Sequence, residues 1–97
     1  MRHFEEIKEI LSSHLDEIRN RFGVREIGIF GSYVRSEESK ESDLDVLVEF
    51  EEGKKNFDNY MDLKFYLEDL FGIKVDLVIK AIKPRLKSYI LSEVVYV

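Results

Sequence analysis

The chain has 97 residues, a single proline and no internal repeat, so we expect one compact domain over residues 1–97 and exclude a second. Its 20 acidic and 15 basic residues give a formal charge of −5, which disfavours a broad electrostatic grip on nucleic acid, and no direct nucleic-acid binding is expected. No apolar run is long enough to span a membrane and the first residues are charged, so we expect a cytoplasmic protein. The lack of cysteine excludes disulfides and thiolate metal ligands.

The first half of the chain is predicted to form one helix followed by two strands. Between Phe4 and Phe22 apolar residues recur at steps of three and four, and Gly23 follows as a C-terminal cap, which indicates an amphipathic helix. The run 24–30 is rich in Ile and Val and ends at a glycine. The run 44–50 alternates apolar and polar residues. Both runs predict strands.

The second half is predicted to add a helix, a strand and a short helix. Asn56 can cap a helix over 57–71, whose apolar residues form one stripe. Residues 74–79 predict a third strand, and Pro84 opens a helix through Ser92 before an apolar tail. Three strands with helices packed on one face make a small α+β sandwich. The other face of the sheet is then partly open, and a site can lie there.

Strand alternation predicts that three aspartates gather on this open face. Asp43 and Asp45 are two residues apart at the start of the second strand, so their side chains project to the same side. In the third strand, Asp76 lies on the face opposite to its apolar neighbours Val75 and Leu77. If the apolar faces share the helix-covered core, Asp43, Asp45 and Asp76 meet on the open face.

Three converging carboxylates repel one another unless a cation lies between them. Mg²⁺ is the natural choice, since it prefers oxygen ligands, keeps waters and binds substrate phosphates. A pair of such ions would be held by Asp43 and Asp45, with Asp76 completing the site and accepting a proton from an attacking hydroxyl. The alternative for Asp43 and Asp45 alone is a turn or exposed strand start. Asp76 fits that alternative poorly, because it interrupts an apolar strand.

A glycine–serine pair follows the first strand and predicts a phosphate-binding turn. Gly31 allows an anion to approach the backbone closely, and Ser32 adds a hydroxyl donor. Taken alone, this pair is most often only a turn. Arg35, one turn later, either meets a phosphate or pairs with Glu37, Glu38 or Glu41, and for a lone arginine the ion pair is the commoner outcome.

Together, the segments Gly31–Arg35 and Ser42–Val48 resemble the signature of the DNA polymerase β-like nucleotidyltransferase superfamily. Ten residues separate Ser32 from Asp43, which is the family's GS-x10-D-x-D spacing. The whole chain is similar to the minimal branch, the MNT domains, in its length, its first helix and its ending over 90–97. One departure is Ser36, where the family often has glycine.

This resemblance implies a mixed three-stranded sheet, ATP as donor and Mg²⁺ as cofactor. By position, Gly31 and Ser32 match the nucleotide-phosphate turn, Asp43 and Asp45 the metal ligands, Asp76 the third carboxylate and Arg35 an arginine of the extended motif. It also implies a partner. Many MNT proteins are antitoxins that form hetero-oligomers with a HEPN-domain ribonuclease toxin and silence it by transferring AMP to a toxin tyrosine.

Two other functions stay open at this point. A non-catalytic antitoxin would use the same fold only to mask its partner, and a small-molecule nucleotidyltransferase would modify a free hydroxyl compound. The intact carboxylate set argues against the first, and the short chain, which offers no second domain to shape an acceptor pocket, argues against the second. A basic cluster near the C-terminal helix is a secondary candidate for partner contact, although a solvated face is its commoner explanation: Lys80, Lys83, Arg85 and Lys87.

Overall fold

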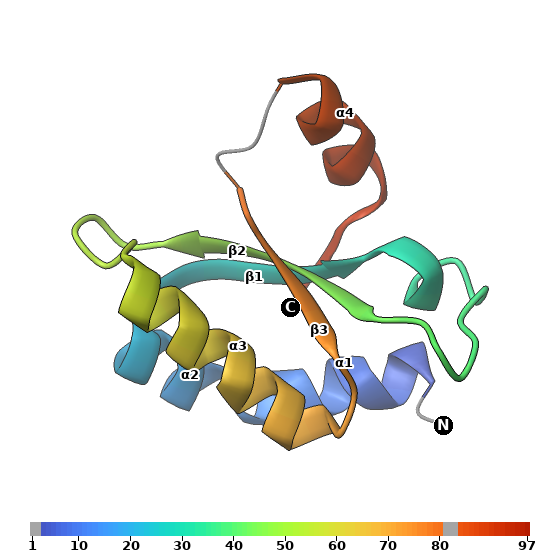
Figure 1. Cartoon of the computed structure of the whole chain (residues 1–97), viewed down its shortest axis with the longest axis horizontal. Coiled ribbons are helices and arrows are strands. Elements are labelled where there is room, and N and C mark those ends of the chain that lie inside the picture. Colours follow the sequence, from blue (N-terminus) through green and yellow to red (C-terminus); the bar gives the residue numbers. More distant parts are fainter. Residues whose placement is uncertain (1–2, 81–83) are drawn as a thin grey trace.

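The computed structural model describes residues 3–80 and 84–97, and for residues 84–87 the backbone alone. Of the basic cluster, Lys83 and the side chains of Arg85 and Lys87 therefore lie outside the described part. The elements follow one another in this order (Figure 1): α1 (Phe4–Ser13), α2 (Leu15–Phe22), β1 (Val24–Phe30), the short 3₁₀ helix η1 (Gly31–Tyr33), β2 (Leu44–Phe50), α3 (Phe57–Phe71), β3 (Val75–Ile79), α4 (Pro84–Glu93) and β4 (Val95–Tyr96).

The single helix predicted for the start of the chain is two helices in the structure, because the helical hydrogen-bond pattern is interrupted at His14. The Ile10 carbonyl accepts from the Ser13 hydroxyl at 2.7 Å and lies 2.9 Å from Nδ1 of His14, so side chains compete there with the backbone ladder. The His14 N–H turns to Leu11, and α2 restarts when Ile18 donates to the His14 carbonyl. Both helices keep their apolar residues toward the sheet, which is why periodicity does not reveal the break.

The sheet is mixed and its strand order is β3-β2-β1-β4. β2 runs antiparallel to β1 and parallel to β3, which confirms the expected α+β class and mixed sheet. β4 is an addition to the three predicted strands: two residues pair antiparallel with Gly28 and Ile29 of β1. Gly28 permits this close approach, because a Cβ there would lie 2.8 Å from a Val94 methyl and 2.9 Å from the Val95 carbonyl.

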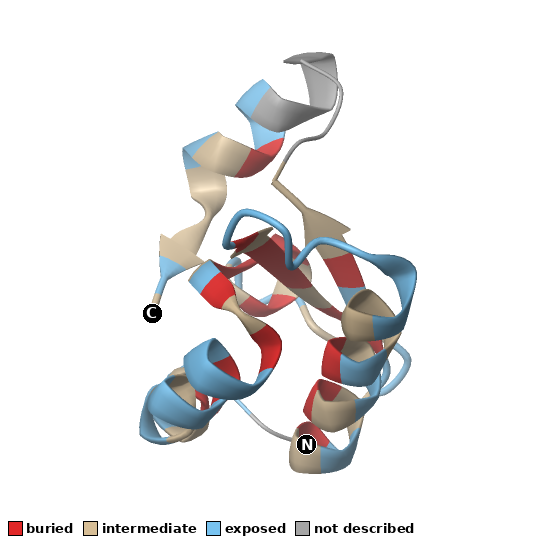
Figure 2. Ribbon diagram, turned by 90° about the vertical axis from the view of Figure 1, so that its left-hand side faces the viewer, coloured by how far each residue is buried: buried red, intermediate tan, exposed pale blue. Residues whose placement is uncertain are grey.

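The main core lies between the sheet and α1, α2 and α3, which cover one face of it (Figures 1 and 2). Both ends of α3 are capped. The Asn56 side chain accepts from the Asn59 N–H at the start, and Gly72 ends the helix in the left-handed conformation. Gly23 ends α2 in the same way. Among the described residues no helix has the length and apolarity needed to cross a membrane.

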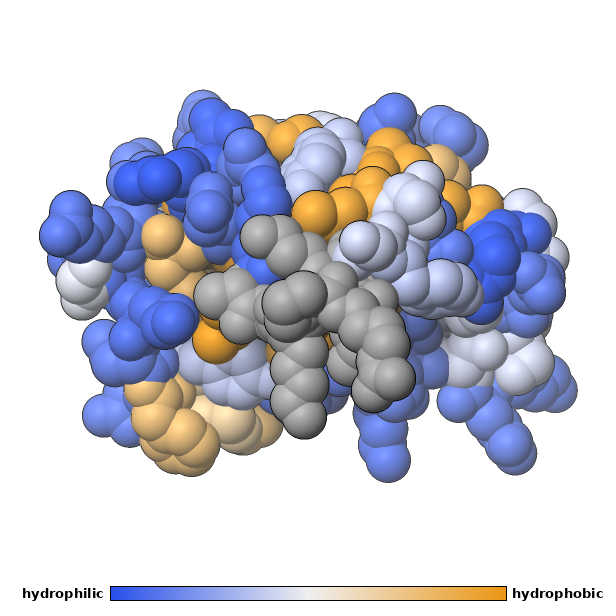
Figure 3. Space-filling view, turned by 90° about the horizontal axis from the view of Figure 1, so that it is seen from above, coloured by the Kyte–Doolittle hydropathy of each residue, from blue (hydrophilic) through white to orange (hydrophobic). Residues whose placement is uncertain are grey.

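The helix α4 lies on the opposite face of the sheet (Figure 1). The structure differs here from the sequence prediction, which placed all helices on one face. There Ile90 packs with Phe30 and Leu47 in a small buried cluster. Seen from this side, the left and right ends of the molecule are mostly hydrophilic, while apolar residues form one group above the centre and a second, paler group toward the lower left (Figure 3). Because α4 covers only part of the face, the aspartates of β2 and β3 keep access to solvent.

Candidate active site

Two of the predicted aspartates lie side by side on neighbouring parallel strands. Asp45 of β2 is the register partner of Asp76 of β3, and adjacent strands are about 4.8 Å apart. Their neighbours Leu44 and Leu77 are buried in the main core, so both carboxylates project to the α4 side of the sheet. Asp45 is half-buried and Asp76 is exposed.

Asp43 lies immediately before β2 and is exposed. Burial raises the pKa of Asp45 to about 6, and the negative charges of Asp76 and then Asp43 add to this shift. The charges of Asp43 and Asp76 therefore both act on the Asp45 carboxylate. Among residues 3–80 and 84–97, however, no three acidic or histidine side chains form a ready-made metal cluster. The aspartates converge on one region without closing around an ion.

The glycine–serine turn directly contacts this region. Gly31 has a φ of +79° and begins η1 where β1 ends. A Cβ at Gly31 would collide with the Asp45 carboxylate, so only glycine fits between the turn and β2. Among the described residues, the Ser32 hydroxyl and backbone N–H make no hydrogen bond and are available to an anion. The two halves of the sequence motif thus meet in space.

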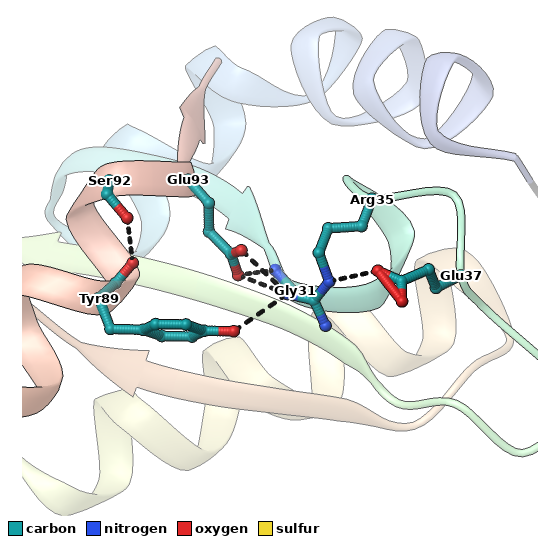
Figure 4. A network of polar contacts seen from close by, with 6 residues as sticks. All are labelled: Gly31, Arg35, Glu37, Tyr89, Ser92 and Glu93. Carbon is teal, nitrogen blue, oxygen red and sulfur yellow. Dashed lines mark hydrogen bonds and ion pairs between the residues drawn. The ribbon is translucent and has the colours of Figure 1, made fainter.

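Arg35 is held by carboxylates from two parts of the chain (Figure 4). Its Nε donates to Glu37 at 2.7 Å, as one of the predicted ion pairs. Its Nη1 donates to both oxygens of Glu93 at 2.9 and 3.0 Å, and lies 3.4 Å from the Tyr89 hydroxyl. Hydrogen bonds to Glu93 and then Glu37 raise the pKa of Arg35, so its charge is permanent at any ordinary pH.

Glu93 is the residue at this site that sequence reasoning missed. It is the last residue of α4, and its Oε1 also accepts from the Gly31 N–H at 2.8 Å. A single acid ahead of the apolar tail carries no pattern, and its 62-residue separation from Gly31 hides the contact. The only available signal was its place within the ending similar to MNT domains.

A cavity of about 860 Å³ adjoins the site on the Asp43 side. Its walls come from α1, η1, the loop before β2 and the end of α3 with the turn that follows: Glu6, Tyr33, Ser39–Asp43 and Phe71–Lys74. None of these residues belongs to α4. Gly31, Ser32, Asp45 and Asp76 do not line it either, so the cavity shares only Asp43 with the candidate site.

A carboxylate set beside an anion-binding turn on a small mixed sheet is the arrangement of a nucleotidyl-transfer enzyme. The chain belongs to the nucleotidyltransferase domain family, which matches residues 11–97. It is similar to the protein adenylyltransferase MntA of Thermococcus cleftensis, with 52% identity over 94 residues, 96% of this chain and 94% of that protein. The resemblance noted from the sequence is confirmed.

Solved structures agree on the fold. One described as a minimal nucleotidyltransferase has a TM-score of 0.82 and 35% identity, and the match covers 97% of this chain and 95% of that chain. Another, of a tri-AMPylated Shewanella oneidensis HEPN toxin in complex with an MNT antitoxin, matches with a TM-score of 0.67 over 93% of this chain and 70% of that chain. Its identity of 17% is a likeness of fold alone.

Proposed function

We propose that this protein is an antitoxin that acts as a protein adenylyltransferase, transferring AMP from ATP to a tyrosine of a HEPN-domain toxin with which it forms a hetero-oligomer. The observation that carries the proposal is the register pair Asp45–Asp76 beside the Gly31 turn. The similarity to a protein adenylyltransferase along nearly the whole chain supports the activity. An ATP-consuming enzyme of this kind belongs in the cytoplasm, where ATP is supplied.

In this proposal the residues of the turn hold the triphosphate. Ser32 offers a hydroxyl and a backbone N–H without competing partners among the described residues, and Gly31 lets phosphate approach. The Nη2 group of Arg35 has no partner in the described part of the chain and can bind a phosphate oxygen. These contacts would orient the α-phosphorus toward the open side of the sheet.

The chemistry is an in-line displacement. The tyrosine oxygen bonds to the α-phosphorus of ATP, the bond to the bridging oxygen breaks and pyrophosphate leaves with the electron pair. Asp76, exposed and opposite Asp45, would accept the phenolic proton.

The donor set fits Mg²⁺. All three candidate ligands are carboxylates. Burial, and then the negative charges of Asp76 and Asp43, raise the pKa of Asp45, and a bound cation would favour its charged form. Asp43 and Asp45 would hold the ions, two in number, and Asp76 would complete the site. When bound, Mg²⁺ offsets the charge of the phosphates and of the leaving pyrophosphate. Since no three acidic or histidine side chains form a closed cluster within residues 3–80 and 84–97, waters and substrate phosphates would have to supply the remaining ligands.

The test is label transfer. The protein is incubated with α-labelled ATP, Mg²⁺ and the product of the adjacent gene, and the reaction is repeated with Asp43→Asn and Asp45→Asn. We expect label on the partner's tyrosine with the parent protein and a loss of at least about 100-fold in each variant, as expected for groups that stabilise transition-state charge. Asp62→Asn, on the exposed side of α3, is the matched control and should keep full activity.

The two alternative functions are outcomes of the same experiment. Neutralisation of the toxin by both aspartate variants, with no label transferred by the parent protein, would replace catalysis with masking by binding. Label found on a small hydroxyl compound and never on the partner would indicate a small-molecule nucleotidyltransferase.

A further inference from the structure

Glu93 links the end of α4 to both parts of the phosphate-binding turn. Its carboxylate accepts from the Gly31 N–H at 2.8 Å and from Nη1 of Arg35 through both oxygens. Figure 4 shows the three residues converging, although they come from η1, the turn after it and the far end of the chain. The Glu93 side chain is 18% exposed and that of Arg35 is 40% exposed, so the bond to Gly31 is partly buried while the pair with Arg35 stays open to solvent.

We propose that Glu93 is a positioning residue for the nucleotide: its carboxylate sets the Gly31 turn and the Arg35 guanidinium in their binding arrangement before ATP arrives. The inference rests on the proposed function, since it assigns a role within the same site. It makes α4 a structural part of that site.

The first argument concerns which donors remain. One N–H group serves one strong acceptor, so while Glu93 holds the Gly31 N–H, that donor is taken. The next donors, the Ser32 N–H and hydroxyl, stay without partners among the described residues. Glu93 thus pins the start of η1 and leaves its next residue facing the ligand. A pinned turn loses less conformational freedom when a phosphate binds.

The second argument concerns the guanidinium. Glu37 takes Nε of Arg35 and Glu93 takes Nη1, while Nη2 has no partner in the described part of the chain. Held along two edges, the planar group presents its third nitrogen at a fixed place. The two carboxylates differ in shielding, because the Glu37 side chain is 62% exposed. Glu93 is therefore the stronger constraint, and Glu37 is a matched comparison.

Two roles of Glu93, as a bare charge and as a positioning residue, predict opposite effects of its removal on ATP binding. The inference is therefore testable. Glu93 lies close enough to the aspartates to raise the pKa of Asp45, whereas Arg35 lowers it. Removing a negative charge from a phosphate site should tighten the binding of a polyanion if nothing else changes. If Glu93 positions the turn and Arg35, its removal should instead weaken binding, because both groups must be ordered by the ligand.

The experiment measures the Kd of Mg²⁺-ATP by calorimetry, and KM and kcat for label transfer, for Glu93→Gln, Glu93→Ala and Glu37→Gln. We expect Glu93→Ala to raise Kd and KM about 10- to 100-fold, the effect of losing charge-assisted hydrogen bonds, with a smaller change in kcat. Glu93→Gln keeps one acceptor oxygen and should fall between Glu93→Ala and the parent. Glu37→Gln should change Kd less than about threefold.

Equal or tighter ATP binding by both Glu93 variants overturns the inference, and so does an equal effect of Glu37→Gln. If Glu93→Ala does not fold, the isosteric Glu93→Gln carries the test. The inference and the proposed function fail separately. Label transfer at parental rate and KM in Glu93→Gln and Glu93→Ala removes only the inference, whereas ATP binding by the parent protein without label on any partner removes only the proposed function.

Discussion

Replacing Asp45 with asparagine should make the metal-free protein more stable. Burial and the charges of Asp76 and Asp43 raise the pKa of Asp45 from 3.8 to about 6. Because its pKa is higher in the folded than in the unfolded protein, the stabilising proton is lost as the pH rises through about 6. Roughly two pH units correspond to about 3 kcal/mol at most, and solvent screening of this half-buried group reduces the cost to about 1–2 kcal/mol at neutral pH.

The assay is urea unfolding followed by circular dichroism at pH 7.5 and pH 4, with chelator present. Urea is preferred to guanidinium because a salt would screen the charges. At pH 7.5 Asp45→Asn should exceed the parent protein by about 1–2 kcal/mol in free energy of unfolding, and at pH 4 the gain should nearly vanish. Asp62→Asn should stay within about 0.5 kcal/mol at both. A variant less stable than its parent at pH 7.5, or a gain equal at both pH values, would refute the reasoning.

Three further predictions concern residues around the site. Ser36 has a φ of +59°, so Ser36→Gly should raise stability by about 0.5–1 kcal/mol in thermal unfolding, whereas Ser36→Ala, which keeps the strain, should not. Gly31→Ala should lower stability by about 1–3 kcal/mol and abolish ATP binding in calorimetry, because the added methyl meets the Asp45 carboxylate. Glu68 accepts from the Val75 N–H at 3.0 Å, and chiefly this bond lowers its pKa. Its stabilisation is present at neutral pH and lost as the pH falls below the usual range of a glutamate, so Glu68→Gln should cost about 1 kcal/mol at pH 7 and little at pH 3 in urea unfolding.

Each of these has an outcome that contradicts it. Equal gains from Ser36→Gly and Ser36→Ala would mean that backbone conformation is not the cause. ATP binding retained by Gly31→Ala would show that the turn can move away from β2. A loss from Glu68→Gln that does not change with pH would point to packing rather than charge.

Strand alternation was enough to predict which face of the sheet carries Asp45 and Asp76. Leu44 and Leu77 lie in the core, and a period of two then places the two carboxylates on the opposite face. Alternation does not predict that the two residues are register partners. The interval from Ser32 to Asp43, as part of the family signature, linked the turn with the aspartate pair, and in the structure Gly31 lies against Asp45. These relations depend on local geometry, which a sequence records.

The features that the sequence did not predict depend on contacts that leave no periodic pattern in it. The break at His14 arises from two side chains competing for one carbonyl, while the apolar stripe runs on unchanged. β4 has too few residues to show an alternation of apolar and polar side chains. Gly28 is the sequence feature that its close approach to β1 requires. The pairing of Arg35 with Glu93 joins residues 58 positions apart, so no spacing rule could favour it over the predicted neighbours such as Glu37.

The register between β2 and β3 makes the number of residues within β3 ahead of Asp76 decisive for the site. Hydrogen bonds fix that register at both ends: the Leu44 N–H donates to the Lys74 carbonyl and the Lys80 N–H to the Val48 carbonyl, both at 2.8 Å. One residue inserted within β3 ahead of Asp76 would place its carboxylate under the helices, leaving a chain with the same motif letters and no acid opposite Asp45.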